Sequence, residues 1–184
     1  MSRSLSRPEP LADRHEIEEF NSGEASLDDW PRRRARANQV SGASRTFVLC
    51  EARTGPAWPS EQLETHADDA EAGSVVRANS SKEKRVVGSY ALASGAVAAE
   101  SATGRLRRNM PDPIPVAVLA RLAVDRSWQG KGLGRALFRD AARRVTNAAD
   151  AIGIRGIVVH AISPAAKKFY LALGSIRARG SPCC

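Results

Sequence analysis

The chain has 184 residues, 42% of them hydrophobic, which is enough for one apolar core and too short for two independent domains. No apolar run approaches the ~18 residues of a membrane span, and the N-terminus lacks the apolar centre of a secretion signal, so we expect a cytoplasmic protein without membrane contact. The net charge of +8 comes mostly from arginine and indicates either a polyanionic partner or arginine-rich solvated helix faces.

The three cysteines are Cys50, Cys183 and Cys184. They show neither metal-ligand spacing nor a set of even pairs, and two of them are adjacent. We therefore expect no bound metal and no structural disulfide.

The first predicted helix covers residues 27–40. Ser26 with Asp29 three residues later has the pattern of a capping box, which favours a helix start at this point. Pro31 conflicts with that start, because it lies beyond the first turn and lacks a backbone N–H. The helix is therefore expected to kink or to begin nearer Trp30.

Four apolar segments rich in β-branched or small residues predict strands, over residues 46–50, 85–97, 116–124 and 154–161. Between the first two, residues 52–84 contain Pro, Gly, Ser and acidic residues without any period, which predicts a flexible insertion.

Two further helices are predicted after the strand at 116–124. Apolar residues recur at helical spacing over 132–149, and a last helix begins after Ser163-Pro164 and ends at Gly174. The resulting strand-helix-strand-helix order predicts the α/β class, with a partly parallel sheet, and a single domain over residues 1–184.

A glycine-rich turn joins the strand ending near Val124 to the long helix. Gly130, Gly132 and Gly134 allow backbone N–H groups and the positive end of the helix to converge on a pyrophosphate, and Arg135 can add a side-chain contact. A tight structural connection is one alternative. A dinucleotide-binding Rossmann unit is another, but it expects an acidic residue after the next strand, where this chain has His160-Ala161.

These motifs resemble a known family. Gln129-x-x-Gly132-x-Gly134 is similar to the signature of GNAT acetyltransferases, and Phe169-Tyr170-x-x-x-Gly174 resembles their last helix. More narrowly, the chain resembles the GNAT toxins of bacterial toxin-antitoxin modules, through residues 20–23, 27–30, 121–125 and 160–161. The resemblance covers most of residues 15–174 and implies the GNAT fold, a mixed central sheet flanked by helices.

The resemblance also implies an acetyl-CoA-dependent N-acetyltransferase. Tyr170 would donate a proton to the departing thiolate, since a phenol with a pKa near 10 is protonated at neutral pH. His160 is expected to be a structural donor rather than the base. Strand 120–124 would pair with the pantetheine arm, and the predicted acetyl-CoA-binding residues are Leu122, Ala123, Val124, Gln129, Gly130, Lys131, Gly132, Leu133, Gly134 and Arg135.

For such toxins the acceptor is the α-amine of aminoacyl-tRNA, acetylation stops translation, and a ribbon-helix-helix antitoxin is the expected partner. A homodimer is left open. Acetylation of a small amine or a protein N-terminus is the alternative, and an inactive relic is a third. Two arginine clusters are candidates for tRNA phosphate contacts: Arg32, Arg33, Arg34 and Arg36, and Arg105, Arg107 and Arg108.

Residues 175–184 depart from the family pattern. Relatives continue after the glycine with an aromatic and a final pair of strands, whereas this sequence turns abruptly to Arg, Ser, Gly and Cys after Gly174. We expect an incomplete C-terminal strand pair, produced by a frameshift just after Gly174. The alternative is a short variant whose tail forms one strand.

Overall fold

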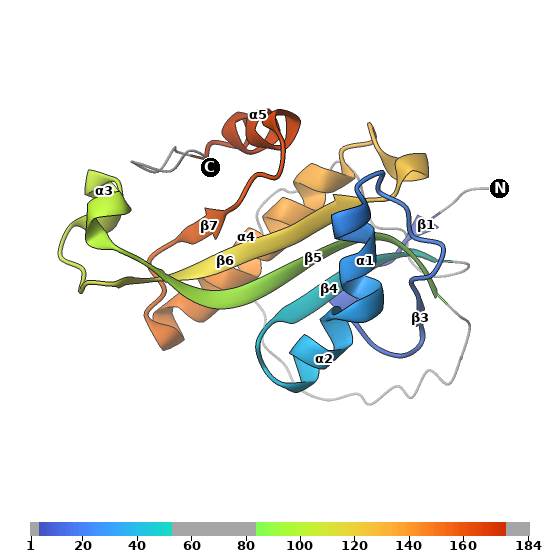
Figure 1. Ribbon diagram of the computed structural model, residues 1–184, viewed down its shortest axis with the longest axis horizontal. Helices are drawn as coiled ribbons and strands as arrows, with labels where there is room; N and C mark the ends of the chain where they lie inside the picture. Colours follow the sequence, from blue (N-terminus) through green and yellow to red (C-terminus); the bar gives the residue numbers. More distant parts are fainter. Residues whose placement is uncertain (1–3, 53–83, 176–184) are drawn as a thin grey trace, which may run out of the picture.

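The computed structural model describes residues 4–52 and 84–175, which form one mixed β-sheet with helices against both faces (Figure 1). The strands are β1 (Ser4–Leu5), β2 (Glu9–Pro10), β3 (His15–Glu16), β4 (Arg45–Ala52), β5 (Lys84–Val97), β6 (Ile114–Val124) and β7 (Ile157–Val159). The helices are α1 (Ala25–Arg33), α2 (Ala35–Val40), α3 (Gly104–Arg107), α4 (Leu133–Ile152) and α5 (Pro164–Ala172), with 3₁₀ turns η1 (Ala99–Ser101) and η2 (Arg126–Trp128).

The main strand order is β1-β4-β5-β6-β7. Neighbours from β1 to β6 are antiparallel, and β6 and β7 are parallel and are joined through α4. In addition, β2 pairs with β4 and β3 pairs with β5. The expected α/β class with a partly parallel sheet is thus confirmed. No helix in the described ranges is long and apolar enough to cross a bilayer.

Side chains alternate between the two faces of the sheet and build two apolar cores. On the α4 face, Leu49 and Val87 pack with Leu137 of α4 and Tyr170 of α5. On the face of α1 and α2, Val48, Cys50 and Val86 pack with a second set of residues, which includes Phe20, Leu27 and Ala35. The site described below lies near the end of β6, where elements of both faces meet.

The first helix differs from the prediction. It begins at Ala25 with Glu24 as its N-cap, and no side chain caps it, so the expected Ser26 capping box is wrong. Pro31 lies inside α1, and the helix breaks at Arg34, whose φ of −123° separates α1 from α2. Interruption near Pro31 was expected because proline cannot donate to the preceding turn.

The predicted strands and late helices lie at the expected places with shifted ends. The strand expected over 154–161 is reduced to Ile157–Val159, whereas the one expected over 46–50 extends to Arg45–Ala52. The Ser163 cap is confirmed, since its hydroxyl accepts the Ala166 N–H at 3.1 Å. The insertion expected at 52–84 and the tail after Ser175 fall almost entirely outside the described residues.

Candidate active site

The site begins with an irregularity in β6. Pairing with β5 passes from Ser89↔Ala123 to Ala91↔Ala120, so β6 carries one extra residue at this point. Arg121 takes a left-handed φ of 58°, an uncommon conformation for a residue with a side chain. Beyond Leu119 the described residues place no strand on the β7 side of β6. The described residues therefore leave the strand edge over 120–124 unpaired on this side, and its pairing with a pantetheine arm stays a prediction.

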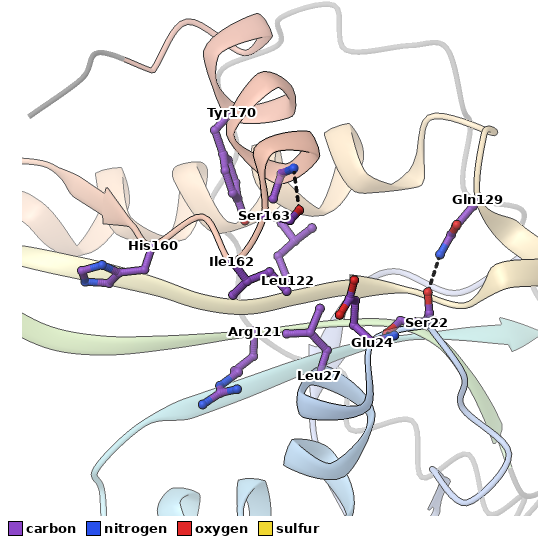
Figure 2. A pocket seen from close by; sticks show the side chains of 11 residues that line it. Ser22, Glu24, Leu27, Arg121, Leu122, Gln129, His160, Ile162, Ser163 and Tyr170 are labelled. Carbon is purple, nitrogen blue, oxygen red and sulfur yellow. Dashed lines mark hydrogen bonds between the residues drawn. The ribbon is translucent and has the colours of Figure 1, made fainter. Parts of the chain in front are cut away.

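A cavity of about 180 Å³ opens beside this edge (Figure 2). Its walls come from β6, from the start of α1 with the preceding loop, from the segment after β7, and from α5. The lining residues are Ser22, Glu24, Leu27, Arg121, Leu122, Gln129, His160, Ile162, Ser163, Ala166 and Tyr170. The cavity thus brings together Leu122, Gln129 and Tyr170, three of the residues predicted from the sequence.

The glycine turn lies between β6 and α4 as predicted, with η2 inserted before it. Gly130 and Gly132 have φ values of +75° and +79°, and Gly132 caps α4 without any side-chain cap, which leaves the helix N-terminus open. Within residues 4–52 and 84–175, no heavy atom outside their chain neighbours lies within 4 Å of a Cβ built on either glycine. This backbone can approach an anionic ligand closely.

Gly134 has a different role in the turn. It lies in the first turn of α4, and an added Cβ would come within 3.3 Å of the Phe169 ring of α5. The glycine therefore permits close packing of the two helices. This packing positions α5, and with it Tyr170.

Several predicted binding side chains are already engaged within the protein. The amide of Gln129 donates to the carbonyls of Ser22, at 2.8 Å, and Val124, at 2.9 Å. The Lys131 ammonium donates to the Ser127 carbonyl and lies over the Trp128 ring. Ala123 and Leu133 are buried, so only their backbone groups remain available, whereas Arg135 is exposed in the first turn of α4.

Tyr170 lies against the cavity with only 9% of its surface exposed. Its ring packs on Phe138 and Phe169, at centroid distances of 6.1 and 5.1 Å. Burial raises the pKa of Tyr170, so its hydroxyl stays protonated at neutral pH. A proton donor needs this state, and the role of Tyr170 as the acid stays a prediction.

Loop residues 20–24 form a wall of the site that the sequence motifs did not assign. The Asp28 carboxylate accepts from both the N–H and the hydroxyl of Ser22, and Asp125 accepts from the Asn21 N–H at 3.1 Å. Burial alone would raise the pKa of Asp125, but hydrogen bonds from Ser127 and Asn21 and the charge of Arg85 lower it. The loop is thus attached to the end of β6 through the Asp125 carboxylate, which stays ionised at neutral pH.

The arginine cluster of α1 and α2 is only partly available to a polyanion. Arg32 donates to the carbonyls of Glu18 and Phe20, and Arg36 donates to that of His15 and pairs with Asp13. Arg32 and Arg36 thus also hold the N-terminal segment in place, and the contacts of the cluster with phosphates stay a prediction.

Glu9, His15 and Cys50 form the one group in the described residues close enough to hold a metal ion. The Ala12 N–H donates to Nδ1 of His15 at 2.9 Å, so in a neutral ring Nε2 carries the proton and donates to Glu9. A metal on Nε2 would require a proton on Nδ1, facing that N–H. Glu9 also accepts from Arg14 and Lys84, which makes the cluster a hydrogen-bonded ion-pair centre.

Comparison with known proteins now defines the class. A family model described as acetyltransferase (GNAT) domain matches residues 76–174, more than half of the chain. The chain therefore belongs to the GNAT family and is an N-acetyltransferase, a class whose acetyl donor is acetyl-CoA.

Its relatives include toxins. A tRNA-acetylating toxin of Mycobacterium tuberculosis is 46% identical over 166 residues, covering 90% of this chain and 81% of that protein. The structure of AtaT complexed with acetyl-methionyl-tRNAfMet matches at a TM-score of 0.75 and 26% identity, over 97% of this chain and 90% of that one. An AtaT mutant bound to the C-terminus of the antitoxin AtaR and acetyl-CoA matches at 0.65 and 25% identity, over 93% and 84%.

Proposed function

We propose that this protein transfers the acetyl group of acetyl-CoA to the α-amine of an aminoacyl-tRNA and so acts as a translation-inhibiting toxin. The observation that carries the proposal is the meeting of the bulged edge of β6 and Tyr170 at one cavity, with the open glycine turn beside it. The 46% identity to a tRNA-acetylating toxin over 90% of the chain supports the substrate class.

The chemistry follows from this arrangement. The neutral amine nitrogen attacks the carbonyl carbon of the thioester, the C–N bond forms and the C–S bond breaks. The thiolate takes a proton from the Tyr170 hydroxyl, and the proton that the nitrogen loses on becoming an amide returns to the Tyr170 oxygen through solvent. Holding both substrates in one cavity supplies much of the rate. A general acid adds roughly a hundred- to ten-thousand-fold.

A toxin of this kind requires a cognate antitoxin, and AtaT is solved with the C-terminus of its antitoxin. We propose a ribbon-helix-helix partner that covers the cavity in the cell, and a tRNA substrate places the protein in the cytoplasm. A homodimer stays a prediction.

Acetyl transfer from labelled acetyl-CoA to charged tRNA tests the proposal. Label should appear on the aminoacyl group, and uncharged tRNA should take up none. Label on free polyamines or peptides but not on charged tRNA would instead favour the small-amine or protein N-terminus alternative. Absence of acetyl-CoA turnover with every acceptor would indicate an inactive chain.

A further inference from the structure

One acidic side chain in the cavity has no role in the chemistry described so far. Among the described residues that line the cavity, Glu24 is the one carboxylate, and Figure 2 shows it directed from the start of α1 toward β6, on the side opposite Tyr170. Its carboxylate makes no hydrogen bond or ion pair with the rest of the described chain, although hydroxyl, amide and guanidinium groups also line the cavity.

The backbone of Glu24 is well fixed. Its carbonyl accepts from the N–H groups of Leu27 and Asp28, at 2.9 and 3.1 Å. The guanidinium of Arg121 donates to the Ser26 carbonyl at 3.1 Å and so ties the first turn of α1 to β6. Because Glu24 is the N-cap and yet makes no side-chain cap, its carboxylate is left for another partner.

The cavity holds a carboxylate, Glu24, and a guanidinium, Arg121, so it offers both charge signs to a substrate. A tRNA acceptor is a polyanion, so a carboxylate at its docking site repels it unless a cation on the substrate faces that carboxylate. The α-amine is such a cation, because with a reference pKa of about 7.7 to 8.0 it is mostly protonated at pH 7. It must lose a proton before its nitrogen can attack.

We propose that Glu24 binds the α-ammonium of the aminoacyl group and accepts its proton; this rests on the proposed function. The carboxylate becomes a carboxylic acid as the ammonium becomes an amine, the nitrogen lone pair attacks the thioester, and Glu24 returns the proton to water after the product leaves. Both Glu24 and His160 are exposed, but Figure 2 shows the His160 ring directed away from Leu122 and Tyr170. It is therefore less suited to this step.

The test compares Glu24→Gln with Asp29→Asn, which removes the same charge from the same helix at a half-exposed side chain outside the cavity. At pH 7, Glu24→Gln should lower kcat/KM for aminoacyl-tRNA about 100-fold, and the deficit should shrink above about pH 8, where the amine is neutral. Asp29→Asn should cause no loss. Both variants should keep wild-type acetyl-CoA affinity, which also verifies their fold.

Glu24→Asp adds a second discriminating variant, because it keeps the carboxylate on a shorter side chain. It should retain part of the activity with the wild-type pH profile. A loss in Glu24→Gln that is equal at every pH, or no loss at all, would overturn the role of Glu24. If the wild-type protein does not acetylate charged tRNA, the proposed function itself fails, and that result is separate from any effect of the variants.

Discussion

The region from β6 to α5 and the N-terminal region before β4 are stabilised in different ways. Regular elements with periodic apolar residues build the first, such as Leu133, Leu137 and Ala141 along α4. The second contains strands of two residues, and its apolar residues are supplemented by polar side chains that hold main-chain carbonyls, such as Arg32 on the Phe20 carbonyl and Gln39 on the Leu11 carbonyl.

The two regions should therefore respond differently to substitutions. Apolar packing is spread over many contacts, whereas the polar links of the second region are individual hydrogen bonds, each worth about 1 kcal/mol and more when its loss orphans a buried partner. Both regions meet at the cavity. Substitutions of residues that line the cavity, in either region, should therefore affect activity, whereas loss of the hydrogen bonds that hold the N-terminal segment should mainly lower stability.

The largest effect is expected at Gly132, for which Gly42 is a control with a similar backbone conformation. Gly132 and Gly42 have φ values of +79° and +76° and open space around a built Cβ, but only Gly132 lies in the turn. Gly132→Asp should abolish acetyl-CoA binding in calorimetry, because a carboxylate would occupy the place of the pyrophosphate. Gly42→Asp should lose a similar amount of stability and still bind. Unchanged affinity in Gly132→Asp would remove this turn from the binding site.

The two tyrosines offer the second contrast. Tyr170→Phe should lower turnover roughly a hundred- to ten-thousand-fold with acetyl-CoA affinity intact. The Tyr90 hydroxyl instead donates to Asp140 and accepts from Arg144, so Tyr90→Phe should reduce the free energy of unfolding by about 1 to 3 kcal/mol without altering turnover. Turnover assays and urea unfolding of both variants measure these two effects. Normal turnover in Tyr170→Phe would show that another group is the acid.

These contrasts also explain how far the sequence could be interpreted. The turn, α4 and α5 were predicted because glycine spacing, helical periodicity and the Ser163-Pro164 start are local signals. The strands β1, β2 and β3 were not predicted. Each has only two residues, too few to show an alternating pattern, and its position depends on a partner strand far away in the sequence. His15, for example, pairs with Lys84.

The site was predicted in part for the same reason. Tyr170 and Gln129 lie in family motifs, but the inward bonds of Gln129 and the place of Glu24 in the cavity depend on the path of loop 20–24. That path is set by Asp28 and Asp125, one of them about a hundred residues away. The local sequence does not show which exposed arginines also hydrogen-bond to main-chain carbonyls, so the cluster at 32–36 was predicted as a unit.

Two double variants that remove the same charge would show which arginines of the cluster at 32–36 contact tRNA. Arg33→Ala/Arg34→Ala should weaken tRNA binding several-fold and flatten its salt dependence, by up to about one slope unit per lost phosphate contact. Arg32→Ala/Arg36→Ala should mainly lower stability, because these side chains hold main-chain carbonyls. A salt slope unchanged in the first pair would show that Arg33 and Arg34 are only solvated.

The smallest expected effect is a pH dependence centred on the N-terminal region. Burial lowers the pKa of His15 from 6.5, so the unfolded chain binds the proton more readily and stability falls as pH drops below about 6.5. Burial alone would raise the pKa of Glu9, but bonds from Lys84, Arg14 and His15 lower it to about 2, which extends the loss below pH 4.5.

Urea unfolding at pH 7.5, 6.5 and 5.5 measures this dependence. His15→Asn keeps an acceptor for the Ala12 N–H and should show a smaller loss between pH 6.5 and 5.5. A wild-type midpoint that does not move over this range would contradict the assignment of His15 as a buried neutral side chain.

The bonds that join loop 20–24 to the end of β6 also constrain when the protein becomes active during its own synthesis. Gln129 reaches Ser22 across 107 positions, and Arg144 reaches the Pro8 carbonyl across 136. Contacts of such separation cannot form until the later segment has left the ribosome, and closing such long loops slows folding. The N-terminal wall of the cavity therefore cannot form before the glycine turn has been made, and the proposed proton donor on α5 emerges later still. A ribosome making this chain should carry no complete active site until synthesis has passed Tyr170.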